Sequence, residues 1–127
     1  MSDPVGIPGE VKYDHLKLAL KFKVTAAVTA GTVCTIDGTT GKLTAAGATS
    51  TGRAVVPLQH ALAADDEVTG MIEGVVLLKC TATAKKGRSV TFAATGQVAP
   101  WTTGDIIGYL AEDCNDITIP VAVRIKG

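Results

Sequence analysis

The side chains that could carry out chemistry are few in this sequence, and they stand far apart. Histidine occurs only at His15 and His60, and this separation fits no zinc motif such as His-x-x-x-His. The serines lie outside any nucleophile-elbow motif; they are Ser2, Ser50 and Ser89. An enzyme needs a convergent set of activated groups, so we expect no catalytic residue, no cofactor and no metal site.

The cysteines Cys34, Cys80 and Cys114 are odd in number. Their spacing in the sequence is too wide for a metal knuckle or a redox pair. This pattern indicates three small hydrophobic side chains in a reducing compartment. The first residues lack the charged and apolar regions of a signal peptide, so we expect synthesis in a host cytoplasm.

Two acidic clusters, Asp65–Glu67 and Glu112–Asp116, could in principle bind a hard cation. Neither follows the ligand spacing of an EF-hand loop. Both occupy positions where Asp and Asn are common simply because they favour turns. We therefore interpret both clusters as solvated turns.

The amino-acid composition argues against some classes of binding partner. The 127 residues include 12 basic and 12 acidic side chains, which gives a formal net charge of +0. This balance argues against a nucleic-acid partner held through its phosphates and against a polybasic membrane surface. Aromatic residues are only 4% of the chain, so the core must be built from Val, Ile, Leu and Ala. Such a core is thin, which favours help from oligomerisation.

The elements that would position any site are short β-strands. Apolar residues alternate with lysines from Leu16 to Val24, which predicts a strand with a buried row of leucines. The apolar run from Val75 predicts a central strand buried on both faces. The only candidate helix, Gln59–Glu67, is short enough that we expect a loop with at most one helical turn. Strands this short, with turns every eight to twelve residues, predict an all-β barrel or sandwich.

The sequence also repeats itself. A shift of about 56 residues places Lys23–Ala26 on Lys79–Ala82 and, with a one-residue slip, Thr40–Leu43 on Thr95–Val98. We interpret residues 15–127 as a single β domain made of two pseudo-repeated units, about 19–74 and 75–127.

Residues 1–14 contain two prolines and two glycines, which oppose both helix and regular strand. We interpret them as an extended arm that either lies on a neighbouring subunit or is a disordered terminus. Its apolar residues Val5, Ile7 and Pro8 are candidate interface residues. Trp101 lies in a Pro-Gly loop and is either an interface anchor or a lid over the core.

The chain resembles small tailed-phage capsid decoration proteins, also called head-stabilising or cement proteins. The resemblance rests on an early Val-x-x-Gly strand start, a mid-chain Gly-Val-Val strand, an Ile-Gly-Tyr strand and a closing Val-x-Val-x-Ile. In this sequence these are Val28–Gly31, Gly74–Val76, Ile107–Tyr109 and Val121–Ile125.

The resemblance implies a non-catalytic homotrimer that binds the major capsid protein on the outer surface of the virion. It implies no nucleic-acid, membrane or small-molecule partner. Two alternatives stay open: another phage structural β domain, such as a tail tube or fibre base, and a β module that encloses a small ligand.

Overall fold

The computed structural model describes residues 16–126, and these form an all-β fold, as the sequence predicts. The expected arm, residues 1–14, lies outside the described residues. A short 3-10 turn, Ala94–Gly96, precedes β7. In order along the chain the strands are β1 (Leu16–Lys23), β2 (Cys34–Ile36), β3 (Leu43–Ala45), β4 (Val56–Pro57), β5 (Glu67–Leu78), β6 (Ser89–Phe92), β7 (Val98–Pro100), β8 (Gly108–Leu110) and β9 (Val121–Ile125).

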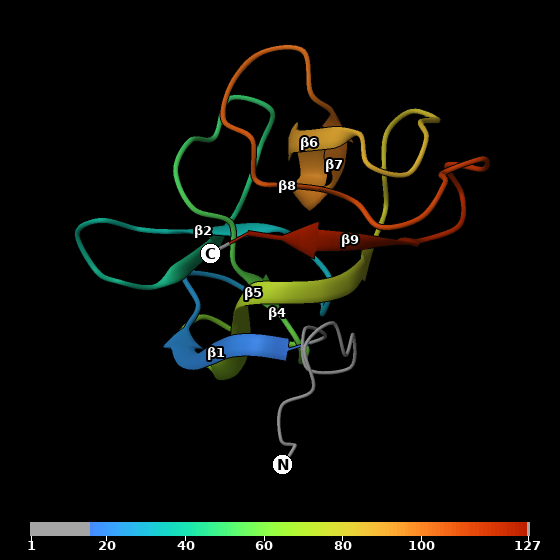
Figure 1. The fold of residues 1–127 in the computed structure, drawn as a ribbon. Coiled ribbons are helices and arrows are strands. Elements are labelled where there is room, and N and C mark those ends of the chain that lie inside the picture. The colour runs from blue at the N-terminus through green and yellow to red at the C-terminus, as the bar shows by residue number, and fades with distance from the viewer. Residues whose placement is uncertain (1–15, 127) are drawn as a thin grey trace.

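The main sheet is antiparallel and follows the strand order β1-β5-β9-β8-β6-β7, with β4 pairing to β5 beside this path. Strands β2 and β3 form a separate two-stranded sheet. Figure 1 shows β1 at one end of the molecule and β6 and β7 at the other, with β5 and β9 between them. Strand β5 therefore connects the two ends, because it pairs with β1, β4 and β9.

Strand β5 is the longest strand and runs unbroken through Gly74, which has φ 146. Glycine tolerates this backbone conformation because it lacks a Cβ. Gly74 pairs with Leu16 at one edge and with Ile125 at the other. The predicted burial on both faces is wrong: Leu78 is buried, whereas Leu77 is 61% exposed. A strand with neighbours at both edges still has an open face when no second layer covers it.

The strand predicted at Leu16–Val24 is present, but its predicted row of buried leucines is not. Val24 is fully buried, whereas Leu18 is 45% and Leu20 is 52% exposed. The pairing of β1 with β5 shifts register on both sides of Leu18. Such bulges turn side chains away from the face that strict alternation would give them. Strand β1 also lies at the edge of the sheet, where less of the core reaches it.

Two buried clusters hold the fold together, and β5 contributes to both. Met71 and Leu78 point into the larger cluster, which extends under β6 to β9. Val68 and Ile72 point into the smaller one, which joins β5 to the β2–β3 sheet. The smaller cluster consists of Val24, Cys34, Leu43, Val55, Ala61, Val68 and Ile72.

Hydrogen bonds of the first half of the chain recur in the second half. The Thr25 N–H donates to the Leu43 carbonyl at 2.9 Å, and the Thr81 N–H donates to the Val98 carbonyl at 2.9 Å. A glycine with positive φ follows in each half. It is Gly31, with φ 83, in the first half and Gly87, with φ 90, in the second. Gly31 donates its N–H to the Pro57 carbonyl of β4 at 3.0 Å, and Gly87 donates its N–H to the Leu110 carbonyl of β8 at 2.8 Å. In each half the acceptor lies on the third strand after the glycine.

A second recurring contact joins the segment after the first strand of each half to a later loop. Val28 and Ala61 exchange two backbone hydrogen bonds, of 3.0 and 2.9 Å. Ala84 and Cys114 exchange the same pair of bonds, of 3.1 and 2.8 Å. The loops 27–32 and 83–88 are thus held in equivalent ways.

Candidate functional site

The interface residues predicted from the sequence are only partly placed by the structure. Val5, Ile7 and Pro8 lie outside the described residues. Trp101 is 37% exposed, and its indole N–H donates to the Gly104 carbonyl at 2.8 Å. Because that donor is satisfied within its own loop, Trp101 would offer a partner the apolar part of its ring.

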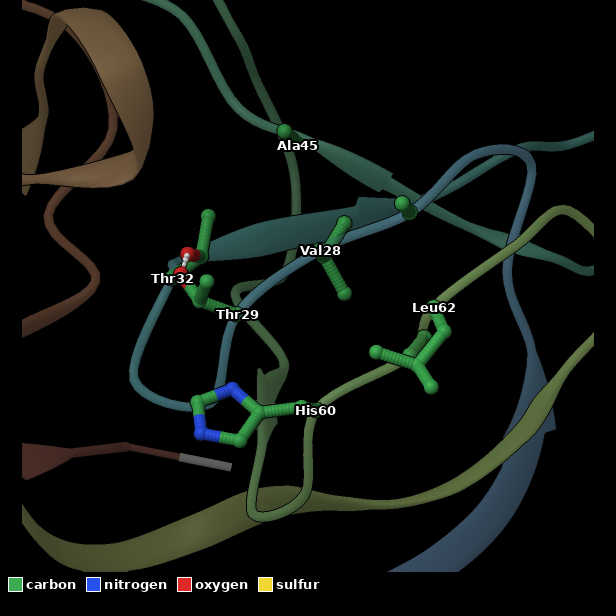
Figure 2. Close-up of a pocket in the computed structure, with 8 residues that line it drawn as sticks. Val28, Thr29, Thr32, Ala45, His60 and Leu62 are labelled. Atoms are coloured by element: carbon green, nitrogen blue, oxygen red, sulfur yellow. Dashed lines mark hydrogen bonds between the residues drawn. The ribbon is translucent and has the colours of Figure 1, made fainter.

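A surface that the sequence did not reveal lies around residues 27–32. Three adjoining shallow hollows meet there. The largest of them has a volume of about 470 Å³, and Figure 2 shows residues that line it. The first two hollows share Thr29 and Thr32, and the second and third share Ala30, Gly31 and Leu77. We call this the loop 27–32 surface. Its exposed apolar residues include Ala27, Ala30, Leu58, Leu62, Leu77 and Pro120.

The loop 27–32 surface is apolar and almost free of charge. Leu62 is 85% exposed, Leu77 is 61% exposed and Leu58 is 37% exposed. Among all the residues that line the three hollows, Lys79 is the one Lys, Arg, Asp or Glu. Depletion of charge around exposed large apolar side chains is typical of a protein–protein interface.

Hydrogen bonds hold the loop in place. The Ala30 N–H donates to the His60 Nδ1 at 3.1 Å, and the hydroxyls of Thr29 and Thr32 lie 3.0 Å apart. Figure 2 shows His60 and Leu62 on one segment, facing Val28 and the two threonines on the other. The surface is therefore preorganised, which lowers the entropy lost when a partner binds.

The bond between His60 and Ala30 makes a testable prediction. The His60 Nδ1 accepts this hydrogen bond, so it is the ring nitrogen that carries no hydrogen. Replacement of His60 by alanine should therefore free the Ala30 amide and move its NMR resonance. An Ala30 resonance that does not move in this variant would show that the bond is not formed in solution.

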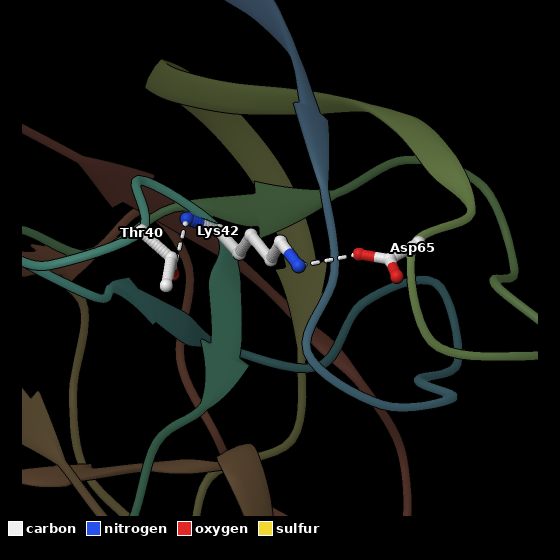
Figure 3. Close-up of polar contacts among 3 residues, drawn as sticks. All are labelled: Thr40, Lys42 and Asp65. Carbon is white, nitrogen blue, oxygen red and sulfur yellow. Dashed lines mark hydrogen bonds and ion pairs between the residues drawn. The ribbon is translucent and has the colours of Figure 1, made fainter.

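The first acidic cluster serves structural contacts. The Lys42 Nζ lies 2.5 Å from the Asp65 Oδ1 across the end of β1 (Figure 3). The Asp66 Oδ2 accepts hydrogen bonds from the N–H groups of Leu62 and Ala63, at 2.9 and 3.1 Å. Residues 59–66 thus form bends, a turn and a bridge to Val28 rather than a helix. Asp66 in particular fixes the turn that presents Leu62.

The second acidic cluster is also divided among separate contacts. The Glu112 carboxylate accepts from the Ala122 N–H at 2.7 Å, and the Asp113 carboxylate accepts from the Lys86 N–H at 2.7 Å. Within residues 16–126, no group of three or more His, Cys, Asp or Glu side chains could hold a metal ion. In the same part of the chain, no helix is both long and apolar enough to cross a membrane.

The ion pair between Lys42 and Asp65 should make stability depend weakly on pH. The hydrogen bond from Lys42, and then its charge, lowers the pKa of the Asp65 carboxyl below its value of 3.8 in an unfolded chain. A lowered pKa contributes stability that is present above about pH 4 and is lost as the pH falls through the lowered value. We expect Asp65→Asn to melt slightly lower than wild type at pH 7, because the pair is exposed. The two melting temperatures should converge in acid, and a difference that persists at low pH would contradict this role.

Comparison with known proteins adds one fact to this geometry. No protein family model and no curated protein sequence matches the chain. The fold matches the base of a phage head fiber. That structure is the head fiber gp8.5 N base in bacteriophage phi29, with a TM-score of 0.66. The match covers 86% of this chain and 93% of the head fiber base, at 14% identity. At this identity the likeness establishes a shared fold, and function must be argued from the surface.

Proposed function

We propose that this chain is a structural protein of a phage particle that attaches to the outer surface of the head. The observation that carries the proposal is the fold shared with a phage head fiber base over nearly the full length of both chains. The apolar, nearly uncharged loop 27–32 surface supports it, because a structural protein needs such a surface to bind its neighbours.

The proposed partners are the major capsid protein and further copies of this chain, in a trimer. Burial of apolar side chains would supply the binding free energy, at about 25 cal/mol for each Å² removed from water. Leu62 and Leu77 have the most apolar area left to bury on this surface. In a trimer three such surfaces act together, so a weak contact for each copy becomes firm attachment. Attachment of many copies would stabilise the shell by mass action.

A second candidate function is the base of a head fiber within a longer assembly. The shared fold favours it, because the matched structure is such a base. Both functions place the β domain on the head. They differ in whether an elongated projection extends outward from it. Negative-stain images of heads that carry the native protein separate the two, since a fiber base predicts projections and a decoration protein predicts a low, regular coat.

The proposal is tested by mixing the purified protein with heads that lack it, followed by sedimentation. The heads are those of the phage that encodes the chain. We expect the protein to sediment with the heads and to saturate at a fixed number of copies per head. Protein that stays in the supernatant at micromolar concentration would rule out attachment to the head.

A further inference from the structure

The fold brings together two cysteines that lie far apart in the sequence. Cys80 follows β5, and Cys114 lies in the loop between β8 and β9. Both side chains are 1% exposed and belong to the same buried cluster. Ala84, four residues after Cys80, exchanges two backbone hydrogen bonds with Cys114. The Cys80 thiol is among the neighbouring groups that raise the pKa of the Cys114 thiol.

The first half of the chain provides an internal reference for this pair. The recurring hydrogen bonds place Cys80 where the first half has Val24, and Cys114 where it has Ala61. Val24 and Ala61 also share one buried cluster. The same backbone arrangement therefore accepts valine and alanine in one half and two thiols in the other. The third cysteine, Cys34, lies in the cluster of Val24 and not in that of the pair.

We propose that Cys80 and Cys114 are a cross-linking site, at which the two thiols become a disulfide when the protein leaves a reducing cytoplasm. The oxidant would be a low-molecular-weight disulfide. One protein thiolate attacks a sulfur of the reagent, which releases one small thiol and leaves a mixed disulfide. The second protein thiolate then attacks the protein sulfur of that mixed disulfide and releases the other small thiol. Two protein thiols thus lose two protons and two electrons, and the reagent is reduced to two thiols.

A small oxidant would reach the cysteine pair through the surface next to Cys114. This residue borders a surface hollow of about 410 Å³ that is also lined by Thr83, Ala84, Lys85 and Asn115. Burial, and then the neighbouring Cys80, raises the pKa of the Cys114 thiol. Because the thiolate is the attacking species, the first step should be slow and should depend on local opening of this loop. We therefore assign Cys114 as the first thiol to react and Cys80 as the one that closes the bond.

The disulfide would tie the end of β5 to the loop that precedes β9. It would enclose β6, β7 and β8 in one covalent loop. A cross-link of this kind stabilises mainly by restricting the unfolded chain. The formation of the disulfide is inferred from the structure alone. The event that would expose the protein to an oxidant, release of a particle from the cell, rests on the proposed function.

The experiment uses the reduced full-length protein and oxidised glutathione, with no heads present. We expect the intact mass to fall by two hydrogens and a digest to yield one peptide that joins Cys80 to Cys114. The melting temperature should rise by about 10 °C and return on reduction. The variant Cys34→Ser should respond like wild type, because burial raises the pKa of the Cys34 thiol to about 11 and it lies in another cluster.

The variants Cys80→Val and Cys114→Ala copy the residues of the first half, so they should fold and should lose the melting shift. A stable glutathione adduct, a cross-link through Cys34, or thiols that react only in denaturant would overturn the proposal. A disulfide that forms but lowers the melting temperature would also overturn it. None of these results depends on whether the protein binds heads, so the two proposals fail separately.

Discussion

Replacement of Gly108 by alanine is expected to destabilise the domain by about 3 kcal/mol or more, or to prevent folding altogether. Gly108 is buried in β8 and pairs with Val90 on one side and Ile125 on the other. A Cβ at this position would overlap the Arg124 carbonyl oxygen and would lie 2.9 Å from its carbon. These are backbone atoms of β9, so the clash cannot be relieved by a side-chain rotation. Urea unfolding followed by circular dichroism measures the loss.

The matched control for this change is Gly38→Ala. Gly38 is exposed, and a Cβ there would meet no atom within 4 Å. Its unfolding midpoint should stay close to that of the wild type. If the two alanine variants were equally stable, β8 and β9 would not approach each other as closely as the fold requires.

The second large effect is expected from Leu62→Asp combined with Leu77→Asp. These side chains are 85% and 61% exposed, so the double variant should fold and melt like the wild type. Its affinity for heads should fall at least about 100-fold, because central apolar residues of an interface each contribute about 2 kcal/mol. Burial of an unpaired carboxylate against a partner adds a desolvation cost. A sedimentation titration with heads measures the change.

The control for the double variant is Ile106→Asp, which places a carboxylate on an apolar residue that is 36% exposed and outside the loop 27–32 surface. We expect its affinity for heads to match that of the wild type. Trp101→Ala tests the interface predicted from the sequence, and a loss larger than that of the double variant would move the interface to the Trp101 loop.

The strands were predictable because their signals are local. The β-branched and aromatic residues of Ser89–Phe92 predict a strand, and β6 has these bounds. Burial was harder to predict than secondary structure. Leu18 is exposed where bulges shift the register of β1 against β5, and a register depends on both strands. Leu20 pairs in regular register but lies on β1 at the edge of the sheet, where it is 52% exposed. Leu77 sits in an apolar run, yet its exposure depends on whether a second layer covers the face of β5.

The surface and the cysteine pair were not predictable for a related reason. The loop 27–32 surface brings together Ala30, Leu58 and Leu77, which no local motif connects. Cys80 and Cys114 are too distant in the sequence for any redox spacing, and they meet only because the Ala84–Cys114 contact forms. The internal repeat does carry this information, since it aligns Cys80 with a residue at the equivalent place in the first half. The repeat in the sequence does not by itself show which loop each half contacts, because that is visible only from the hydrogen bonds of the folded chain.

The placement of the protein on a decorated head is the most direct test of its function. Electron cryomicroscopy of heads saturated with the wild-type protein would show which surface of the domain meets the shell or a neighbouring copy. We expect the loop 27–32 surface, with Leu62 and Leu77, to lie buried in one of these contacts. Heads without added density, or bound domains with that surface facing solvent, would contradict the account.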